Sequence, residues 1–492
     1  MAKILFYSIY NTCEPVFAIE MEVMAKHIEN GDDVYVLRCH DGELNYCDLN
    51  PEHRSDICMK CDRSFYQNIK LINLDPKKIL RIPKIDISYK KIPKFFSNIE
   101  ELQSFFLEGI NFGLCTASTI ISEYKDHKID TKKHQEKIYR LLKTSYFSYK
   151  FMEKVFADLN PDVFYHQGGR VANIYPLYKL ADKLNIKRYS ITDAGVMTKY
   201  DLFEGFTFFD FDKIAQNIEK VWNDDSSDED KIEKASKWFV DKRNGLDVEW
   251  MSYTKDQQKN LLPDNFNEEK NNIAIFNSSI NEYCSVENTQ NTLYEDETDA
   301  LRNIFEHYKD DDNIHFYLRI HPNLKNLDNT QIKELREISK RGYKNVSIIW
   351  PEEKIDSYAL LLSCNKIVTF FSTVGVEACF WGKPSILAGR AFYEKLDCCY
   401  VPKNHGELMS LIAKDILPKN KNEAIKYGYW QMKRGYDYQK YDPSSHFGGL
   451  FLKQSMAVKF SSVDKIFLKI RKRKSKIINK VKKFLSKFNI LF

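Results

Sequence analysis

Three groups of polar residues in the segment 317–389 have the types and spacing of a phosphate-binding site. The segment includes YLRIHPN, VSIIWPEE, DSYALLLSC and KIVTFFSTVGVEACFWGKPSILAG, which contain His321-Pro322, Ser372-Thr373 and Glu377. Short apolar runs that alternate with helix-like segments are typical of β-α-β units and a parallel sheet. Ligands of open α/β sheets bind at the carboxyl ends of the strands, so these residues predict a site for a phosphate-bearing nucleotide.

His321 comes directly after one of these runs, and Pro322 ends the strand and favours an extended conformation for His321. A histidine at such a position can donate a hydrogen bond to a phosphate oxygen in either its neutral or its charged form. The alternative is a turn with a surface histidine. His321 alone leaves both interpretations open.

Ser372 and Thr373 stand between an apolar run and a helix-like segment. Hydroxyl groups and free backbone N–H groups at a helix N-terminus form a natural anion site. Serine and threonine are also common there as helix caps, and the two interpretations are compatible. Gly375 would let the backbone approach a ligand closely.

Glu377 lies in VGVEACFW, five residues before the Gly382-Lys383-Pro384 sequence. A carboxylate at this position can accept hydrogen bonds from both hydroxyl groups of a ribose. A glutamate on a helix is usually solvated, but this helix is otherwise apolar, and a buried carboxylate needs partners. His-Pro, Ser-Thr and Glu at successive strand ends are together a stronger signal than any one of them.

Two Rossmann-like domains must position these residues. We place the second domain at 269–425, beginning with the strand NIAIFNSSINEY and continuing in strand–helix alternation to PSILAG. The first domain, 1–268, opens with the strand KILFYSIY, a helix over about 16–30 and the strand DVYVLRC. It lacks G-x-G-x-x-G, which argues against a dinucleotide site.

Further elements of the first domain are predicted from the same patterns. The run IKLINL is expected to be a strand, 98–159 to be mostly helical, and DVFYHQGGR and KRYSITDAGV to be strand–loop units. The segment 224–268 is acidic and polar, with helical pieces, and leads into the second domain. A crossover helical segment is expected at 426–460 and a basic tail at 461–492.

Length and composition set the class of the protein. A chain of 492 residues is too long for one core, and its 43% hydrophobic and 29% charged residues describe an ordinary globular protein. No signal peptide or membrane-spanning run is expected, and 11 cysteines without a secretory signal favour a reducing cytoplasm. Outside the basic tail the net charge is −6, which argues against nucleic-acid binding.

Four cysteines lie in a polar insert at 39–67. Cys39, Cys47, Cys58 and Cys61 follow the pattern C-x7-C-x10-C-x2-C. A cytosolic cluster with one C-x-x-C pair fits a structural zinc site, in which thiolates bind tetrahedrally. The alternative is buried, metal-free cysteines. Cys398 and Cys399 are expected to be core residues.

The tail from Lys465 onward carries 11 lysines and arginines and no acidic residue. Its apolar residues recur at helical spacing. They are Ile466, Ile470, Ile477, Val481, Phe484, Leu485 and Phe488. A basic amphipathic helix with aromatic residues is typical of binding to an anionic membrane surface. RNA or a partner helix are the alternatives, although RNA binding needs no regular apolar stripe.

The order RIHPN followed by FFSTVGVEACFWGKPSI resembles the C-terminal nucleotide-sugar domain of GT-B glycosyltransferases. More narrowly, it is similar to capsule and surface-polysaccharide transferases, including the Kdo- and sialyltransferase-like groups with a His-Pro and a Ser/Thr motif. The resemblance covers about residues 270–400. It implies that His321 and Ser372 or Thr373 contact the donor phosphate, and Glu377 the donor sugar or ribose. Arg319 and Gly375 of the same motifs are counted with the donor-binding residues.

The loop in FNSSINEY also resembles a loop of these transferases, which implies that Asn277, Ser278, Ser279 and Glu282 lie near the cleft. In the first half, HQGGR and TDAGV resemble a Gly-Arg loop and an acidic motif that carries the catalytic base. This implies Asp193 as general base and Gly169 and Arg170 on the acceptor side.

The acidic motif departs from the family at Ala194, where relatives often have a second acid. Glu204, also counted with the acceptor-binding residues, and Glu14 are therefore alternatives for the base. Asp193 also fits a turn before Gly195.

The resemblance implies a fold of two Rossmann-like domains facing a cleft, with a C-terminal basic helix. The expected enzyme moves a sugar from a nucleotide-activated donor to a lipid-linked or growing surface polysaccharide of capsule or lipopolysaccharide type. No catalytic metal is expected. The expected location is the cytoplasm, peripheral on the inner face of the membrane. A polyol-phosphate transferase of teichoic-acid type and a non-catalytic sugar-binding scaffold are the alternatives.

Overall fold

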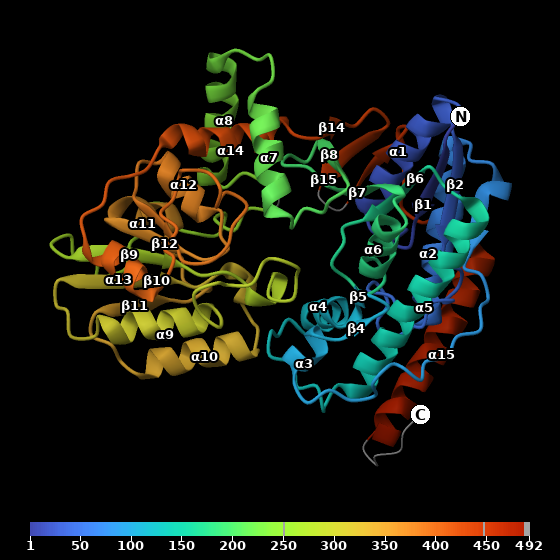
Figure 1. The fold of residues 1–492 in the computed structure, drawn as a ribbon, viewed down its shortest axis with the longest axis horizontal. Coiled ribbons are helices and arrows are strands. Elements are labelled where there is room, and N and C mark those ends of the chain that lie inside the picture. Colours follow the sequence, from blue (N-terminus) through green and yellow to red (C-terminus); the bar gives the residue numbers. More distant parts are fainter. Residues whose placement is uncertain (249–250, 446–447, 487–492) are drawn as a thin grey trace.

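The computed structural model describes residues 1–248, 251–445 and 448–486. Two Rossmann-like domains, each built on a largely parallel sheet with helices around it, stand side by side (Figure 1). This confirms the fold class expected from the sequence. Within the described residues, no helix has both the length and the apolar character needed to span a membrane.

The first sheet has seven strands. They are β1 (Lys3–Tyr7), β2 (Asp33–Arg38), β3 (Ile79–Arg81), β6 (Val163–Gln167), β7 (Lys187–Asp193), β8 (Lys199–Glu204) and β14 (Tyr436–Asp437). Five of them run parallel in the order β3-β2-β1-β6-β7, and β8 and β14 add antiparallel at one edge.

Helices surround this sheet. They are α1 (Val16–Glu29), α2 (Ser55–Asn68), α3 (Ile99–Gln103), α4 (Phe112–Tyr124), α5 (Gln135–Leu159) and α6 (Tyr175–Lys183). A two-stranded hairpin of β4 (Phe106–Leu107) and β5 (Ile110–Asn111) precedes α4. The predicted α1 and the mostly helical stretch 98–159 are therefore confirmed.

The second sheet is parallel throughout. Its strands are β9 (Asn271–Phe276), β10 (Ile314–Arg319), β11 (Val346–Ile349), β12 (Lys366–Thr369) and β13 (Ser385–Leu387). Its helices are α9 (Glu297–His307), α10 (Thr330–Lys340), α11 (Ser357–Ser363), α12 (Val374–Phe380) and α13 (His405–Ala413). Four of these strands are largely buried, as their apolar sequences predict, whereas the edge strand β11 is mostly half-buried.

Three helices join the domains at one end of the molecule: α7 (Phe211–Trp222), α8 (Asp228–Arg243) and α14 (Lys421–Lys433) (Figure 1). Trp238 and Phe239 of α8 and Trp430 of α14 are fully buried in one apolar cluster with Phe203 of β8 and Phe380 of α12. This cluster therefore contains side chains from both domains.

After α14 the chain returns to the first domain. It forms β14, then the small antiparallel sheet of β15 (Tyr441–Ser445), β16 (Gly448–Phe451) and β17 (Gln454–Ser455), and ends in α15 (Ser462–Ser486). Helix α15 packs on α2, and Arg63 of α2 pairs with Asp464 at 2.5 Å. Arg471 of α15 pairs with Asp41, in the loop after β2, at 2.5 Å.

Both sheets have the same topology. Counted along each domain, the parallel strands stand in the order 3-2-1-4-5, so the order reverses between β1 and β6 and between β9 and β12. Ligands of open α/β sheets bind beyond the carboxyl ends of the strands at such a reversal. The fold therefore has two candidate ligand edges, one in each domain.

Two predicted elements are wrong. The run IKLINL is a short 3-10 helix over Ile69–Ile72, because Ile69 and Ile72, three residues apart, both face the core. The segment 426–460 is helical only through Lys433. Gly435 has φ +84°, which ends the helix, and short strands follow.

In the tail, the side chains from residue 478 onward, including those of Val481, Phe484, Leu485 and Phe488, lie outside the described part.

Candidate functional site

A cavity of about 340 Å³ lies at the carboxyl edge of the second sheet, next to the reversal between β9 and β12. Most of the donor-binding residues predicted from the sequence line it. They are Asn277, Arg319, His321, Ser372, Thr373 and Glu377, together with Glu282. The volume is typical of a small-molecule site. We call this space the donor cavity.

His321 is held in one orientation by its neighbours. Its backbone N–H donates to Asn277 Oδ1 at 2.8 Å, and its Nδ1 accepts from the backbone N–H of Asn323 at 3.1 Å. Burial, followed by the nearby Arg319 charge, lowers the pKa of His321 to about 4. At neutral pH the ring is therefore uncharged, and its one proton lies on Nε2, where it can be donated.

Arg319 is buried at the end of β10. Its Nη1 donates to the carbonyl of Trp350 at 2.7 Å and its Nη2 to the carbonyl of Glu353 at 3.2 Å. These bonds fix the loop after β11. Arg319 thus supplies positive charge beside His321, while its guanidinium binds backbone carbonyls of the loop that forms the cavity wall.

Ser372 and Thr373 follow β12, as predicted, but α12 after them has only seven residues. Ser372 Oγ accepts from the backbone N–H of Val374 at 3.3 Å. Thr373 Oγ1 donates to Glu377 Oε1 at 2.8 Å and accepts from Lys242 Nζ at 3.1 Å. Both hydroxyl groups line the cavity.

Glu377 is buried and already has several donors. Tyr358 donates its hydroxyl to Oε2 at 2.5 Å, and Lys242 Nζ lies 3.1 Å from Oε1. Burial on its own raises the pKa of Glu377, but Lys242 and the hydrogen bonds outweigh burial and hold the pKa below its usual value. Glu377 is therefore a carboxylate anchored within the wall. Sequence patterns gave no signal for Lys242, which lies in α8 before the second domain.

The loop after β9 forms another wall. Asn277 lines the cavity, whereas Ser278 and Ser279 are buried and hold the loop. Ser278 Oγ accepts from the backbone N–H of Phe371 at 3.0 Å, and the Ser278 N–H donates to Glu297 Oε2 at 2.8 Å. Glu297 also accepts from the Tyr283 hydroxyl. Ser278 is thus placed to position the loop.

Gly375 does not line the cavity. A Cβ at this position would lie 2.3 Å from Tyr393 Oη and 2.7 Å from Thr369 Oγ1. Gly375 was predicted to let the backbone approach a ligand, but it instead lets α12 pack closely against Tyr393 and Thr369.

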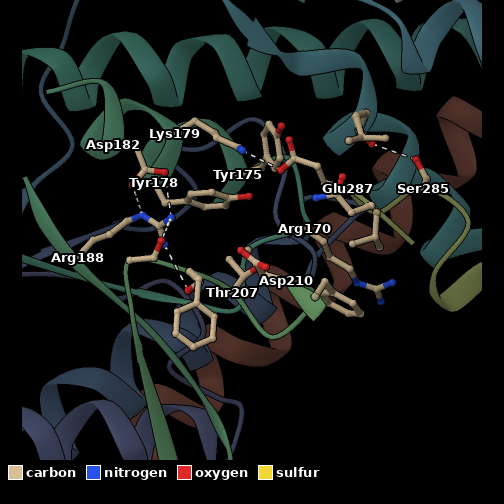
Figure 2. A pocket seen from close by; sticks show the side chains of 17 residues that line it. Arg170, Tyr175, Tyr178, Lys179, Asp182, Arg188, Thr207, Asp210, Ser285 and Glu287 are labelled. Carbon is tan, nitrogen blue, oxygen red and sulfur yellow. Dashed lines mark hydrogen bonds and ion pairs between the residues drawn. The ribbon is translucent and has the colours of Figure 1, made fainter. Parts of the chain in front are cut away.

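Figure 2 shows a second cavity, of about 240 Å³, on the side of the first domain. Gly169 and Arg170 line it, as does the chain from Ser285 to Asn288. Arg170 Nη1 donates to the carbonyl of Glu282 at 2.6 Å. The loop 277–288 therefore borders both cavities. We call this space the acceptor-side cavity.

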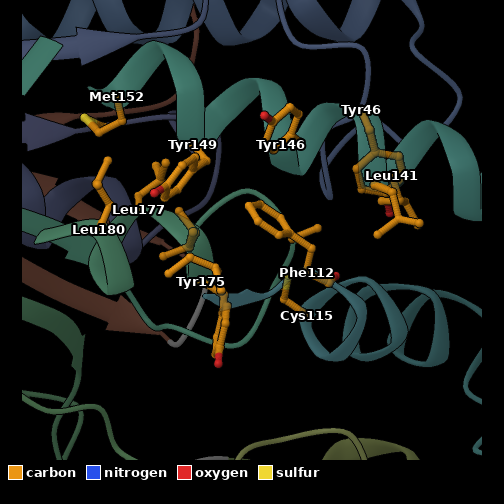
Figure 3. Packing of buried hydrophobic residues seen from close by; sticks show 14 of the residues in the cluster. Tyr46, Phe112, Cys115, Leu141, Tyr146, Tyr149, Met152, Tyr175, Leu177 and Leu180 are labelled. Atoms are coloured by element: carbon orange, nitrogen blue, oxygen red, sulfur yellow. Dashed lines mark hydrogen bonds between the residues drawn. The ribbon is translucent and has the colours of Figure 1, made fainter. Parts of the chain in front are cut away.

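Four charged side chains of the acceptor-side cavity form two pairs. Arg188 binds Asp182 through two bonds of 2.6 and 2.9 Å, and Lys179 lies 2.7 Å from Glu287 (Figure 2). Helix α6 forms one wall. Its Tyr175 lines the cavity, while Leu177 and Leu180 pack in the core of the first domain beside Tyr149 and Met152 (Figure 3).

Acidic residues gather at the carboxyl edge of the first sheet. Asp193 ends β7 and is exposed, and Glu14 follows β1 and accepts from the Gly449 N–H at 3.1 Å. Burial raises the pKa of the Cys13 thiol, and the charges of Asp193, Glu20 and Glu14 raise it further. These three carboxyl groups therefore lie around the same loop.

Glu20 of α1 is the residue of this edge that sequence reasoning missed. It is buried, accepts from Ser8 after β1, and accepts from Gln167 Nε2 at the end of β6 at 3.2 Å. Burial raises the pKa of Glu20 to about 8. Glu20 thus connects the two strand ends at the reversal of the first sheet.

Glu204 lies away from the carboxyl edge of the first sheet, where Asp193 and Glu14 gather. Because β8 runs antiparallel, Glu204 pairs with Tyr189 near the start of β7, whereas Asp193 ends that strand. Its carboxylate is bound by the Tyr189 hydroxyl at 2.8 Å and Lys187 at 3.1 Å. The structure does not bring Glu204 to the ligand edge, so its predicted role as an alternative base or acceptor ligand is not supported.

The four cysteines of the insert come together. Cys39, Cys47, Cys58 and Cys61 all line one cavity of about 40 Å³. Burial raises the pKa of Cys58 and of Cys61 to about 11. Within the described residues, however, no three of these sulfurs lie within 4.8 Å of one another. The convergence fits a cysteine cluster, and the zinc site stays a prediction.

A separate cluster of charged residues joins the two domains. His127 Nε2 lies 3.5 Å from Asp296 and 3.9 Å from Glu334, a spacing that a metal ion could use. The ammonium of Lys128 already lies 2.9 Å from both carboxylates. The arrangement is therefore a network of ion pairs, in which the loop after α4 of the first domain binds α9 and α10 of the second.

Residues 250–396 match the model of a family described as "Capsule polysaccharide biosynthesis protein". The match covers most of the second domain and less than a third of the chain. It includes every residue of the donor cavity that was predicted from the sequence. No curated protein matches the chain in sequence.

Solved structures match the chain at low similarity. Thermosulfurimonas dismutans KpsC, a beta Kdo 2,4 transferase, is 12% identical with a TM-score of 0.34, over 55% of this chain and 79% of that chain. A UDP-GlcNAc 2-epimerase from Neisseria meningitidis bound to UDP-GlcNAc is 12% identical with a TM-score of 0.25, over 86% and 98% of the two chains.

Proposed function

We propose that this protein is a glycosyltransferase of capsule or related surface-polysaccharide synthesis, which takes a sugar from a nucleotide-activated donor. The observation that supports it best is the donor cavity. His321, Ser372, Thr373 and Asn277 come from different strand ends and meet in one space of about 340 Å³. The family match over the same residues points to the same pathway.

Transfer would proceed between the two ligand edges. The acceptor oxygen bonds to the anomeric carbon of the donor sugar, while the bond from that carbon to the phosphate oxygen breaks. His321 donates its Nε2 proton in a hydrogen bond to the departing phosphate, and the hydroxyls of Ser372 and Thr373 add further donors. Because these donors are already in place before the reaction begins, they stabilise the negative charge that develops on the departing phosphate.

A carboxylate must take the proton of the acceptor hydroxyl. We propose Asp193 for this role, with Glu14 as the second candidate, because both lie at the carboxyl edge of the first sheet. The acceptor, a lipid-linked or growing glycan, would enter beside Gly169 and Arg170 in the acceptor-side cavity. We further propose that transfer needs no divalent cation, since Lys242 and Arg319 bring positive charge to the donor cavity.

Nucleotide binding is the first test. In a thermal-shift screen with CMP, CDP, UDP, GDP and TDP, we expect at least one nucleotide to raise the melting temperature of the protein, because a ligand that binds the native state stabilises it. If none of the five raises it at millimolar concentration, the proposal is wrong.

The role of His321 is tested with donor hydrolysis and transfer assays on the nucleotide sugar that the screen identifies. We expect His321→Ala to lower kcat about 100-fold or more, the usual effect of removing one donor to a developing anion. His315→Ala is the matched control, because His315 lies on the same strand and binds Ser347 at 2.8 Å outside the cavity. Equal activity of the two variants would exclude His321 from the reaction.

We also propose that α15 holds the enzyme on the anionic inner surface of the cytoplasmic membrane. One side of α15 is bound to the first domain through Asp464 and Arg471. Apolar side chains of this helix are more than half exposed. They are Val463, Ile466, Phe467, Ile470 and Ile477. Exposed apolar residues between lysines and arginines are typical of a helix that lies in a membrane interface.

The membrane proposal is tested by flotation with phosphatidylcholine vesicles, with and without phosphatidylglycerol. We expect binding only to the anionic vesicles and a loss of binding in the double variant Phe467→Asp, Ile470→Asp. Leu417→Asp is the control, because Leu417 is 80% exposed but lies in the second domain. Flotation of the double variant at the wild-type level would contradict the proposal. Deleting the tail is a poorer test, since α15 also covers α2.

A further inference from the structure

Glu282 stands between the donor cavity and the acceptor-side cavity. It ends the 3-10 helix Ile280–Glu282 in the loop after β9, and its side chain lines the donor cavity. Its backbone carbonyl accepts a hydrogen bond of 2.6 Å from Nη1 of Arg170, which lines the acceptor-side cavity. Further along the same loop, Ser285 lines that cavity as well. Glu282 therefore lies where the two cavities approach each other.

We propose that Glu282 binds the sugar that is transferred, by accepting hydrogen bonds from its hydroxyl groups, and that it excludes sugars that carry a carboxylate at the same place. The inference rests on the proposed function, because it assigns the sugar of the nucleotide-activated donor to a part of the donor cavity away from the phosphate donors. It names the class of sugar, which the proposed function leaves open.

Asn323 connects Glu282 to the residue that faces the donor phosphate. The side-chain amide of Asn323 donates to Glu282 Oε1 at 2.9 Å, and its backbone N–H donates to His321 Nδ1 at 3.1 Å. The phosphate and the sugar of a nucleotide sugar share one oxygen, so the sugar begins next to the group that His321 binds. The acceptor comes from the side of Arg170. The sugar must therefore lie between these two residues, and Glu282 is hydrogen-bonded towards both.

Glu282 has the capacity to bind a further group. Its side chain is exposed, and within the part of the chain that the structure describes, Asn323 is the only hydrogen-bond partner of its carboxylate. Glu377, the other carboxylate that lines the donor cavity, is buried and already accepts from Tyr358 and Thr373. Because a carboxylate offers about four acceptor positions, a sugar can bind Glu282 without displacing a protein group.

The charge of Glu282 discriminates between classes of sugar. An ionised carboxylate only accepts hydrogen bonds, so it suits sugar hydroxyl groups, which donate to it. A carboxylate on the sugar would face it as a like charge, and such a repulsive contact sets specificity as effectively as an attractive one. Desolvation raises the pKa of Glu282, and the Asn323 hydrogen bond and the Arg170 charge oppose this by favouring the ionised form.

Arg170 is the cation that a sugar acid would need, and Glu282 already compensates its charge. Burial lowers the pKa of Arg170, and the charge of Glu282 is the largest of the effects that oppose burial. A sugar carboxylate bound to Arg170 would have to lie beside the Glu282 carboxylate. The preference for a neutral sugar thus follows from two protein charges that already balance each other.

Isothermal titration of the full-length protein separates sugar binding from nucleotide binding. The probes for a uridine site are UDP, UDP-glucose and UDP-glucuronate, since the two sugars differ by one carboxylate. For another base, the corresponding nucleotide and pair of nucleotide sugars replace them. We expect wild type to bind UDP-glucose at least tenfold more tightly than UDP-glucuronate. If the screen selects CMP, the probe is CMP-sialate, a sugar acid, and tighter binding of CMP-sialate than of CMP would overturn the inference.

Two variants of Glu282 separate its charge from its hydrogen bonds. We expect Glu282→Ala to bind UDP-glucose at least tenfold more weakly than wild type and to bind UDP equally, because UDP has no sugar to lose contact with Glu282. Glu282→Gln still accepts through its amide oxygen, so it should lose most of the discrimination against UDP-glucuronate. Glu295→Ala should match wild type with every probe, because Glu295 is 76% exposed and lies outside both cavities.

The failure of the inference can be told apart from the failure of the proposed function. If wild type binds no nucleotide, the proposed function fails and the inference fails with it. If wild type binds UDP, and Glu282→Ala binds UDP-glucose as tightly as wild type does, the donor site stands and the role of Glu282 is refuted. Preference of wild type for UDP-glucuronate over UDP-glucose would refute the exclusion of sugar acids.

Discussion

Replacing Glu20 by glutamine should make the protein less sensitive to alkaline pH. Glu20 is buried between Ser8 and Gln167, and burial raises its pKa from 4.5 to about 8. The folded protein therefore keeps a proton on Glu20 that the unfolded chain releases near pH 4.5. Stability conferred by this group is complete below pH 4.5 and is lost as the pH rises through 8.

The size of the effect follows from the two pKa values. A shift from 4.5 to about 8 corresponds to ~5 kcal/mol once both states are ionised, and ~3.5 kcal/mol of this falls between pH 5 and pH 8. Glutamine resembles the protonated acid, since it can accept from Gln167 and donate to Ser8 without ionising. The variant should therefore gain ~3.5 kcal/mol relative to wild type over that interval.

Urea unfolding of both proteins at several pH values from 5 to 8 measures this. Glu297 and His321, with pKa values of about 7 and about 4, also titrate in or near this interval, so the relevant quantity is the difference between variant and wild type. Glu29→Gln, at the exposed end of the same helix, should differ from wild type by less than about 1 kcal/mol at every pH. A Glu20→Gln difference that does not grow with pH would refute the reasoning.

Three shorter predictions follow from other contacts. Gly375→Ala should lower the free energy of unfolding by about 1–3 kcal/mol, because its Cβ would overlap Tyr393 and Thr369, whereas Gly406→Ala has room; equal urea midpoints would contradict this. If the cysteine cavity holds zinc, elemental analysis should find about one ion per chain, lost in Cys58→Ser; metal-free wild type would exclude the site. Lys128→Ala should destabilise the contact between the domains and increase protease cleavage near residues 125–130, because Asp296 and Glu334 lose the ammonium that lies 2.9 Å from each; an unchanged cleavage rate would show that the network is dispensable.

The donor cavity could be predicted largely from the sequence because parallel strands bring their carboxyl ends to one edge. His321, Ser372 and Thr373 follow apolar runs, and once the runs are recognised as strands their meeting is a consequence of topology. The acidic edge with Asp193 and Glu14 follows by the same reasoning. Glu204 does not, because β8 runs antiparallel and its end points the other way.

The residues that were missed depend on contacts between elements far apart in the chain. Lys242 and Tyr253 belong to a connecting segment whose path over the second domain leaves no periodic pattern. Glu20 is one of several acids on a helix, and its burial depends on Gln167, which is 147 residues away. Gly375 was expected to serve a ligand because its packing against Tyr393 cannot be seen in a local pattern.

The return of the chain to the first domain affects how the protein can be made. The edge of β8 is covered by β14, and roughly 230 residues separate Glu204 from Tyr436. At about 5–20 residues per second, the ribosome needs roughly 10–50 s to synthesise that interval. During this time β8 is an open strand edge that can pair with another chain. We therefore expect nascent first domains to depend on chaperones, and fragments that end before residue 436 to aggregate when expressed alone.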